Sequence, residues 1–224
     1  MIVWLASFPR SGNTLVRTVL QSVFGLKSYS KYEAKASRSP KGMADHLVSA
    51  IGAVSYDGDY PEFYASAQAD PGVTVVKTHD QPEDGGQAIY VVRNGLVATD
   101  SYRHYRIQID EQHAPWPEIV NGGTPFNNWS LHLDAWNPLE RPDTLLLTYE
   151  ALVREPTAAH ARIAEFLDVE PVAAWVDPWA SMNAARPDFF RRGQAGVPDT
   201  LTGEEIEIFM ARHGEWMRRL GYAP

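Results

Sequence analysis

A short apolar run, a polar turn and an amphipathic helix open this chain and limit the folds available to it. Residues 2–6 are apolar and suit a buried strand, while the turn at 7–14 is rich in small and polar residues. Apolar side chains over 15–23 then recur at helical spacing. This arrangement directs backbone N–H groups and the positive end of a helix dipole to one point. The sequence therefore predicts an anion site in the turn.

Several residues of the turn can contact such an anion. Gly12 lets the backbone approach closely, and Arg10 carries a permanent planar cation that suits phosphate or sulfate. Ser11, Asn13 and Thr14 add side-chain donors. The turn is not a Walker A loop, because Asn13 follows Gly12 where that loop has lysine. The alternative interpretation is an ordinary strand-to-helix turn in which Ser11 or Asn13 is the N-cap.

Further apolar runs predict more strands of the same sheet. They lie at 73–77, 88–92 and 144–149, and helical patterns alternate with them. We expect an α/β protein with a single-domain, P-loop-like, three-layer fold, in which helices flank a doubly wound, central parallel sheet. Residues 27–72 and 104–128 lack clear periodicity, so loops and short helices are expected there, together with binding specificity.

Charged and polar residues follow two of these strands. Lys77 and His79 stand at the end of the second predicted strand, Arg93 ends the third, and Ser101 lies eight residues later on a predicted helix. Ligands of open α/β sheets bind beyond the carboxyl ends of the strands. Lys77 and His79 should therefore face the crevice of the Arg10 loop, and Arg93 with Ser101 suits a second phosphate clamp. Taken singly, His79 suits a surface position and Arg93 a salt bridge.

Composition narrows the functional classes. The 224 residues suit one domain spanning 1–224, and the formal net charge of −8 argues against a nucleic-acid or anionic-membrane surface. The chain has no cysteine, which excludes disulfides and thiolate metal sites. The first apolar run ends by Pro9, too short for a signal peptide or a membrane span. We expect a cytoplasmic protein without nucleic-acid or membrane partners.

Aromatic residues supply the few candidates for contacts with a substrate. Trp129, His132 and Trp136 share one face of a predicted helix, and such stripes are usually core packing. His132 is the member that could face a pocket instead. Phe8 and Trp116 are further candidate contacts.

Residues typical of helix ends predict two further helices. Pro156 opens one of them. The last helix starts with a possible capping box of Thr202 and Glu205 and ends at Gly221, a predicted C-cap.

In this order and spacing, the motifs resemble those of the sulfotransferases that use 3′-phosphoadenosine 5′-phosphosulfate (PAPS). The chain resembles a compact bacterial-type member along residues 1 to about 220. The matching elements are Pro9-Arg10-Ser11-Gly12-Asn13-Thr14, Lys77-Thr78-His79, Arg93-Asn94 with Ser101, Trp129 with His132 and Trp136, Tyr149-Glu150, and Arg191-Arg192-Gly193 with Gly196.

The resemblance implies an activity and a set of roles. The enzyme would transfer a sulfuryl group in line from PAPS to a hydroxyl of a small-molecule or natural-product acceptor and release 3′,5′-phosphoadenosine (PAP), without a metal. His79 would be the general base, with Lys77 and Arg10 stabilising the transferred group and the leaving phosphate. The residues implied in nucleotide binding are Arg10, Ser11, Gly12, Asn13, Thr14, Arg93, Ser101, Tyr149, Arg191, Arg192 and Gly193.

The chain also departs from the family pattern. Leu15 replaces a tryptophan that stacks on adenine, Gly95 replaces a proline, Arg192 replaces a lysine, and 197–199 depart from the usual Asp-Trp-Lys. Two alternatives therefore stay open: an ATP-dependent P-loop kinase, which would need magnesium, and a non-catalytic PAP-binding protein. The retained Lys77 and His79 favour an active enzyme.

Overall fold

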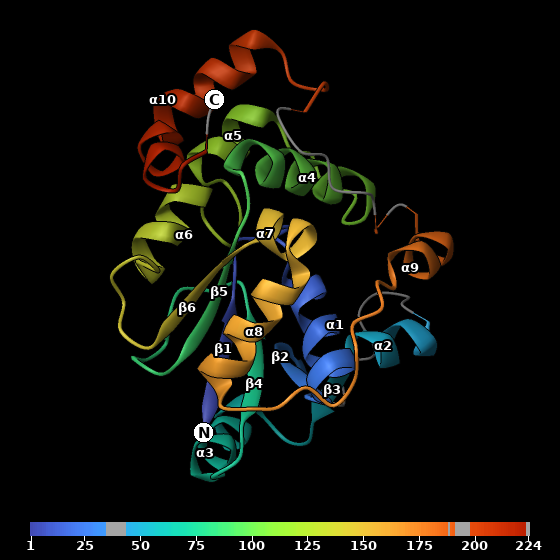
Figure 1. Ribbon diagram of the computed structural model, residues 1–224. Coiled ribbons are helices and arrows are strands. Elements are labelled where there is room, and N and C mark those ends of the chain that lie inside the picture. Colours follow the sequence, from blue (N-terminus) through green and yellow to red (C-terminus); the bar gives the residue numbers. More distant parts are fainter. Residues whose placement is uncertain (35–43, 188, 191–197, 223–224) are drawn as a thin grey trace.

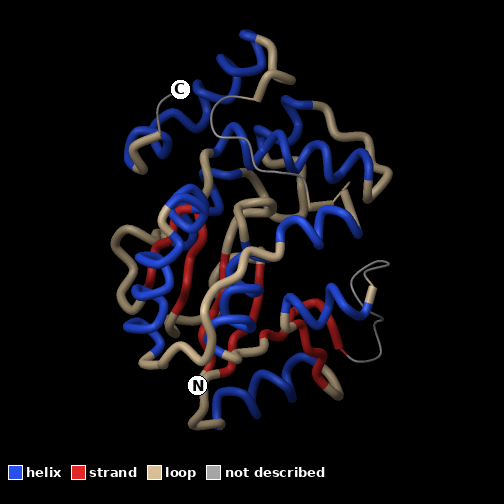
Figure 2. Tube along the Cα trace, turned by 45° about the vertical axis from the view of Figure 1, so that its right-hand side comes forward, coloured by secondary structure: helices blue, strands red, loops and turns tan. Residues whose placement is uncertain are grey.

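The structure is a computed structural model that describes residues 1–34, 44–187, 189–190 and 198–222. Its described strands form one six-stranded, parallel sheet in the order β3-β2-β4-β1-β5-β6. Figure 2 shows the strands in the middle of the molecule with helices on both sides. The elements are β1 (Ile2–Ala6), α1 (Asn13–Phe24), β2 (Ser28–Ala34), α2 (Asp45–Ile51), β3 (Ala53–Tyr56), α3 (Tyr60–Ala69), β4 (Thr74–Thr78), β5 (Ala88–Val92), α4 (Gly95–Gln108), α5 (Trp116–Asn121), α6 (Trp129–Trp136), β6 (Thr144–Thr148), α7 (Tyr149–Arg154), α8 (Pro156–Leu167), α9 (Trp179–Ala185) and α10 (Gly203–Arg219).

Strand β1 lies inside the sheet, between β4 and β5, and feeds both hydrophobic cores. Ile2, Trp4 and Ala6 pack on one face with side chains of α3, α4, α5, α6 and α10. Val3 and Leu5 pack on the other face with α1, α7 and α8. The period of two along a strand separates the two sets, and a strand buried on both faces is apolar throughout. The predicted parallel three-layer fold is confirmed.

The segment expected to hold loops and short helices contains two strands as well. Strand β2 pairs in parallel with β3 and β4, and β3 forms the edge of the sheet. Ser28 and Ser30 of β2 are 0% and 1% exposed. The buried positions of this strand hold serines and not apolar residues. Hydrophobic periodicity therefore did not predict the strand.

A glycine, and not a polar side chain, stands at the start of the first helix. Gly12 is the N-cap of α1, with φ 109°, and no side chain caps the helix. The alternative interpretation, in which Ser11 or Asn13 would be the N-cap, is therefore wrong. The last helix begins as predicted, because Thr202 and Glu205 form the capping box of α10, but its C-cap is Leu220 and not the predicted Gly221.

The carboxyl ends of the strands point toward α4, α5 and α10, which lie at the top of Figure 1. The last strand, β6, ends at Thr148, and Tyr149 already begins the short helix α7. The side chain of Thr148 caps that helix by accepting from the N–H of Ala151 at 3.1 Å. Among the described helices, none is both long and apolar enough to cross a membrane.

Candidate functional site

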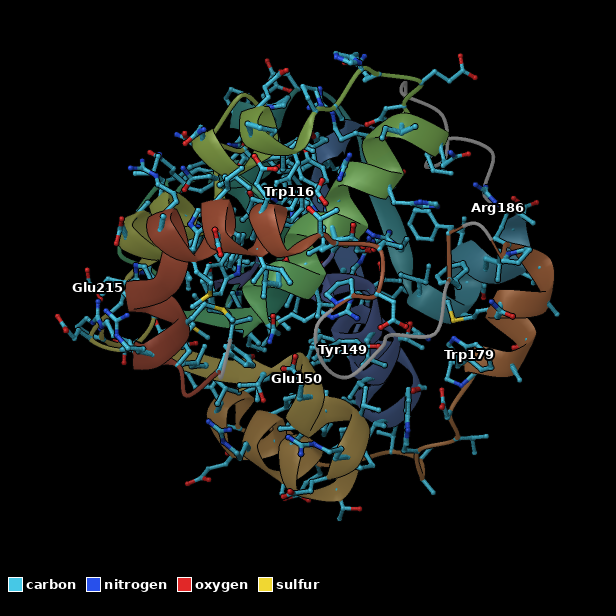
Figure 3. All side chains as sticks on the ribbon, turned by 90° about the horizontal axis from the view of Figure 1, so that it is seen from above. Trp116, Tyr149, Glu150, Trp179, Arg186 and Glu215 are labelled. Atoms are coloured by element: carbon cyan, nitrogen blue, oxygen red, sulfur yellow. The ribbon has the colours of Figure 1, made fainter. Side chains whose placement is uncertain are left out.

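Four loops meet at the carboxyl edge of the sheet, which Figure 3 shows from above. Strand β1 leads into the Arg10 loop, β4 into His79, β5 into Arg93 and β6 into Tyr149. Because β4 and β5 both pair with β1, and β6 pairs with β5, these loops are neighbours. Strand ends that lie up to 142 positions apart in the sequence, at residues 6 and 148, thus meet on the same edge.

The turn before α1 has the properties of an anion site. The first N–H groups of a helix have no partner within the helix, and α1 has neither a side-chain cap nor an acidic residue in its first turn. The Oγ of Ser11 is buried and forms no hydrogen bond with the described residues. An uncapped helix start beside an unsatisfied hydroxyl donor fits a phosphate or sulfate group.

The side chain of Asn13 has a different task from the one expected. Its Nδ2 donates to the carbonyl oxygen of Leu5 at 3.1 Å and to the Oγ of Ser7 at 3.3 Å. The amide thus fixes the turn to the end of β1, so it is the backbone N–H of Asn13 that remains for an anion. Thr14 lies in the first turn of α1 and is partly exposed.

Tyr149 joins the first loop to the Arg93 loop. A Cβ at Gly12 would lie 2.7 Å from Cδ2 of Tyr149, so the ring contacts the glycine directly. The guanidinium carbon of Arg93 is 4.4 Å from the centroid of the same ring. Nη1 of Arg93 also donates to the carbonyl oxygen of Arg10 at 3.3 Å. The glycine, the ring and the guanidinium form a stack that connects two of the loops.

The guanidinium of Arg10 reaches the second predicted clamp. Its Nε donates to the Oγ of Ser101 at 3.4 Å, and its Nη2 donates to the carbonyl oxygen of Phe189 at 2.8 Å. The guanidinium carbon is 4.8 Å from the Phe189 ring centroid and 5.5 Å from that of Tyr105. Arg10 has φ 65°, an uncommon left-handed conformation for a residue with a side chain. The structure thus places Arg10 beside Ser101 on α4.

His79 is held so that one ring nitrogen is basic. Its Nδ1 lies 2.7 Å from the carbonyl oxygen of Ser7, which can only accept, so Nδ1 carries the proton and Nε2 has the lone pair. Burial and the nearby ammonium of Lys77 hold the pKa of His79 well below its ordinary value, which keeps the imidazole neutral near neutral pH. A neutral imidazole with a defined tautomer is suited to general-base chemistry.

Two aromatic residues lie beside His79, one from each segment expected to carry binding specificity. Tyr32 accepts from the backbone N–H of His79 at 2.8 Å, and its ring centroid is 4.8 Å from Nζ of Lys77. The Phe126 ring lies 5.4 Å from the imidazole of His79 and 6.1 Å from the Tyr32 ring. Neither contact with His79 could be predicted from the sequence, because each residue is 47 positions away from His79 and lies in a segment without a periodic pattern.

Glu150 fixes the loop after β5, and this role was not expected either. Its carboxylate accepts from the backbone N–H of Asn94 at 3.0 Å and from the hydroxyl of Tyr222 at 2.8 Å. Asn94 in turn caps α4 by accepting from the N–H groups of the first turn. A carboxylate that binds both the loop and a residue beyond the last helix holds Arg93 at the edge of the sheet.

The three candidate acceptor contacts are buried in the core. Phe8, Trp116 and His132 are 1%, 2% and 1% exposed, so none presents a surface to a substrate in this structure. Trp116 donates to the carbonyl oxygen of Glu205 at 2.8 Å, and Phe8 packs edge-on against Tyr102. Each is enclosed in the core beneath the loops. The remaining predicted ligands, Arg191, Arg192 and Gly193, lie outside the described residues.

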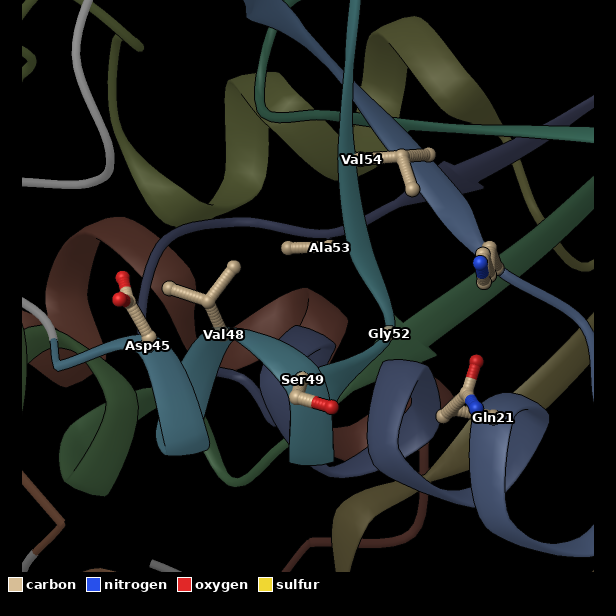
Figure 4. Close-up of a pocket in the computed structure, with 8 residues that line it drawn as sticks. Gln21, Asp45, Val48, Ser49, Gly52, Ala53 and Val54 are labelled. Atoms are coloured by element: carbon tan, nitrogen blue, oxygen red, sulfur yellow. The ribbon is translucent and has the colours of Figure 1, made fainter.

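A hollow of about 290 Å³ lies between α1, α2 and β3 (Figure 4). Its polar lining comes from the side chains of Gln21, Lys27, Asp45 and Ser49. None of the residues that line it is one of the individually predicted site residues, although all of them except Gln21 fall in the segment 27–72. It is therefore separate from the four loops at the carboxyl edge.

Comparisons with known proteins identify a family that the chain matches. A model of the sulfotransferase domain matches residues 2–184. Sulfotransferase 1B1 of Canis lupus familiaris is 22% identical over 179 residues, which cover 73% of this chain and 58% of that protein. Sulfotransferase 1C2 of Oryctolagus cuniculus is 21% identical over 95% of this chain and 75% of its own length. The first of these matches thus spans little more than half of the relative.

Solved structures have the same fold. Mouse sulfotransferase SULT7A1, crystallised with PAP, superposes with a TM-score of 0.65 at 17% identity, covering 99% of this chain and 89% of that one. Retinol dehydratase, in complex with androsterone and the inactive cofactor PAP, gives a TM-score of 0.65 at 16% identity and covers 97% and 80%. At such identities the likeness concerns the fold, which is the P-loop-like arrangement expected from the sequence.

Proposed function

Since the chain belongs to the sulfotransferase family, we propose that it transfers a sulfuryl group from PAPS to a hydroxyl group of a small-molecule acceptor. The observation that carries the proposal is the environment of His79. A neutral imidazole, with its Nδ1 proton bound by Ser7, lies on the same edge of the sheet as an uncapped helix start and three cationic side chains, those of Arg10, Lys77 and Arg93.

The residues of the first loop fit the 5′ end of the nucleotide. We assign the 5′-phosphate to the backbone N–H groups of Gly12, Asn13 and Thr14 and to the hydroxyl of Ser11, which has no protein partner among the described residues. Gly12 fits this task because its lack of a Cβ lets the turn lie against Tyr149. Two solved relatives in fold were crystallised with PAP, which supports the choice of nucleotide.

The second clamp fits the 3′-phosphate. We assign that group to Arg93 and Ser101, with Arg191, Arg192 and Gly193 as further proposed ligands. The contact between Arg10 and Ser101 adds the Arg10 guanidinium to this clamp, which differs from the role beside the sulfuryl group that the resemblance suggested. Guanidinium groups bind phosphate through paired N–H donors, so two of them make a strong site for a dianion.

When bound, PAPS supplies the sulfuryl group; the residues of the chain supply the proton transfer and the charge. Nε2 of His79 takes the proton of the acceptor hydroxyl, because Nδ1 is already protonated and bound by Ser7. The ammonium of Lys77 provides positive charge beside His79, where negative charge develops during transfer. We propose that these side-chain cations stabilise the developing negative charge without a metal ion.

The acceptor would reach His79 past Tyr32 and Phe126. Their rings border the imidazole, and they come from the two segments, 27–72 and 104–128, in which we propose that acceptor specificity resides. Retinol dehydratase has been crystallised with androsterone and with retinol, both small molecules with a hydroxyl group. We therefore propose a small alcohol or phenol as the acceptor.

The proposal is tested by incubating the protein with PAPS and a panel of phenols and alcohols and measuring PAP release and sulfated product. The wild type should form product, and His79→Ala should lower kcat by about 10²- to 10⁴-fold while its affinity for PAP stays the same. The Arg162→Ala variant is a control, since Arg162 lies on α8, donates to the carbonyl oxygen of Leu146 at 2.9 Å and belongs neither to the site nor to the two segments. A His79→Ala variant with full activity would remove the proposed base.

A further inference from the structure

His132 is buried beneath His79 in the middle of α6. Its side chain is 1% exposed and spans two polar groups: Nδ1 lies 2.7 Å from the hydroxyl of Tyr90, and Nε2 lies 3.0 Å from the carbonyl oxygen of His79. Burying a histidine is costly unless its nitrogens are paired. Both nitrogens are paired here, and one of the partners is the backbone of the proposed base.

The protons of this chain of contacts can be assigned. The carbonyl oxygen of His79 only accepts, so Nε2 of His132 donates to it. Nδ1 of the neutral ring is then the acceptor, and the hydroxyl of Tyr90 donates to it. Burial lowers the pKa of His132 to about 4, so the ring keeps this neutral form at neutral pH. The direction of each hydrogen bond is therefore defined.

A second residue of α6 holds the next carbonyl group. Nε1 of Trp136, one turn after His132, donates to the carbonyl oxygen of Asp80 at 2.8 Å. Two side chains on one helix face thus bind two consecutive carbonyls just beyond β4. The other anchors of His79, Ser7 and Tyr32, hold its ring and its N–H, so the backbone carbonyl is the point that α6 secures.

We infer that His132 is a positioning residue, which donates a hydrogen bond to the backbone of His79 and so keeps Nε2 of His79 directed at the acceptor. The inference rests on the proposed function and deepens it. A displacement of about 1 Å at a reacting group can reduce a rate by about 10²-fold, so a buried residue without contact to the substrate can affect turnover strongly.

Two substitutions separate the hydrogen bond from simple packing. His132→Phe keeps an aromatic ring but removes the donor. His132→Gln keeps an N–H donor that can reach the carbonyl of His79. His213 provides the matched controls His213→Phe and His213→Gln, because it is 1% exposed and joins a hydroxyl, Ser130 at 2.7 Å, to a carbonyl, Val120 at 3.2 Å, away from His79.

Three quantities are measured for each variant: kcat with PAPS and an acceptor, the Kd for PAP, and the tautomer of His79 from long-range ¹H–¹⁵N NMR spectra. We expect His132→Phe to lower kcat by about 10- to 100-fold, to leave the Kd for PAP within about threefold and to deplete the Nδ1–H tautomer of His79. His132→Gln should recover most of kcat and of the tautomer. Both His213 variants should retain them.

Two outcomes would overturn the inference: a folded His132→Phe protein with wild-type kcat and an unchanged tautomer, or equal losses in the Phe and Gln variants. If His132→Phe does not fold, His132→Gln with low kcat and a depleted tautomer would overturn it as well. A wild type that does not use PAPS would contradict the proposed function alone. In that case the tautomer of His79 still tests the positioning role, because it is measured by NMR without turnover: it should be depleted in His132→Phe and retained in His132→Gln.

Discussion

The ring of Tyr149 lies directly against Gly12, where a Cβ would come within 2.7 Å of its Cδ2. The guanidinium of Arg93 covers the same ring, 4.4 Å from its centroid. This contact connects the turn before α1 with the end of β5 and the start of α7. Glycine is therefore needed at position 12 for two reasons: the backbone has φ 109°, and a Cβ would collide with the ring of Tyr149.

Gly12→Ala should therefore destabilise the protein and weaken PAP binding together. A side chain at this positive φ costs about 1–3 kcal/mol in backbone strain, and displacement of the Tyr149 ring adds to that. Urea unfolding gives the loss of stability, and calorimetric titration gives the loss of PAP affinity.

Gly221→Ala is the matched control for backbone strain alone. Gly221 has φ 74°, and a Cβ there would meet nothing within 4 Å. Its alanine variant should lose stability by strain and keep its PAP affinity. Equal effects of the two substitutions on PAP binding would show that the contact with Tyr149 does not shape the nucleotide site.

Arg93→Ala should discriminate between nucleotides with and without a 3′-phosphate. A hydrogen bond to a charged group contributes about 1.5–3 kcal/mol, so the variant should bind PAP about 10- to 100-fold more weakly. Its affinity for adenosine 5′-monophosphate, which lacks the 3′-phosphate, should change far less. Arg154→Ala is the control, since Arg154 is exposed on the neighbouring α7. Equal losses for both nucleotides would exclude Arg93 from the 3′-phosphate clamp.

Two buried histidines should make the fold sensitive to acid. Burial lowers the pKa of His132 and of His213 to about 4, below the value of about 6.5 in an unfolded chain. Above about pH 6.5 both states are neutral and the histidines add no pH dependence. Below it the unfolded state binds protons first, so the free energy of unfolding falls by up to about 1.4 kcal/mol per pH unit for each histidine until about pH 4.

Urea unfolding at several pH values from neutral down to about 4.5, near the lower end of the window set by these pKa values, measures this slope. His213→Gln replaces one titrating ring with an amide. It should reduce the pH dependence of the unfolding free energy by the contribution of one histidine, up to about 1.4 kcal/mol per pH unit. An unchanged slope in that variant would show that the pKa of His213 is the same in the folded and unfolded protein, which would contradict the shift caused by burial.

Much of the fold followed from hydrophobic pattern, and the exceptions have a physical cause. Strands β1, β4, β5 and β6 are buried by apolar residues, so their sequences show them. Strand β2 instead buries Ser28, whose hydroxyl accepts from Nε of Arg17 at 2.7 Å. A strand stabilised by polar contacts has no apolar period, and the pairing that defines it becomes visible only in the sheet.

The site shows the same division. The rule that ligands bind beyond the carboxyl ends of parallel strands brought Lys77, His79 and Arg93 to one edge from the sequence alone. It could not show that Arg10 reaches Ser101, 91 residues away, or that His132 turns inward to the backbone of His79. Those features depend on how the helices pack on the sheet. The helical spacing of Trp129, His132 and Trp136 is the same whether the histidine faces a pocket or a backbone carbonyl.

The measurement that tests the account most directly is a calorimetric titration of the protein with PAP, repeated with ATP, in EDTA. The proposed clamps predict that PAP binds at one site per chain and far more tightly than ATP, without magnesium, because the chain's own cations and N–H groups hold both phosphates. No binding of PAP, or binding of ATP only after magnesium is restored, would contradict the sulfotransferase account and favour a kinase.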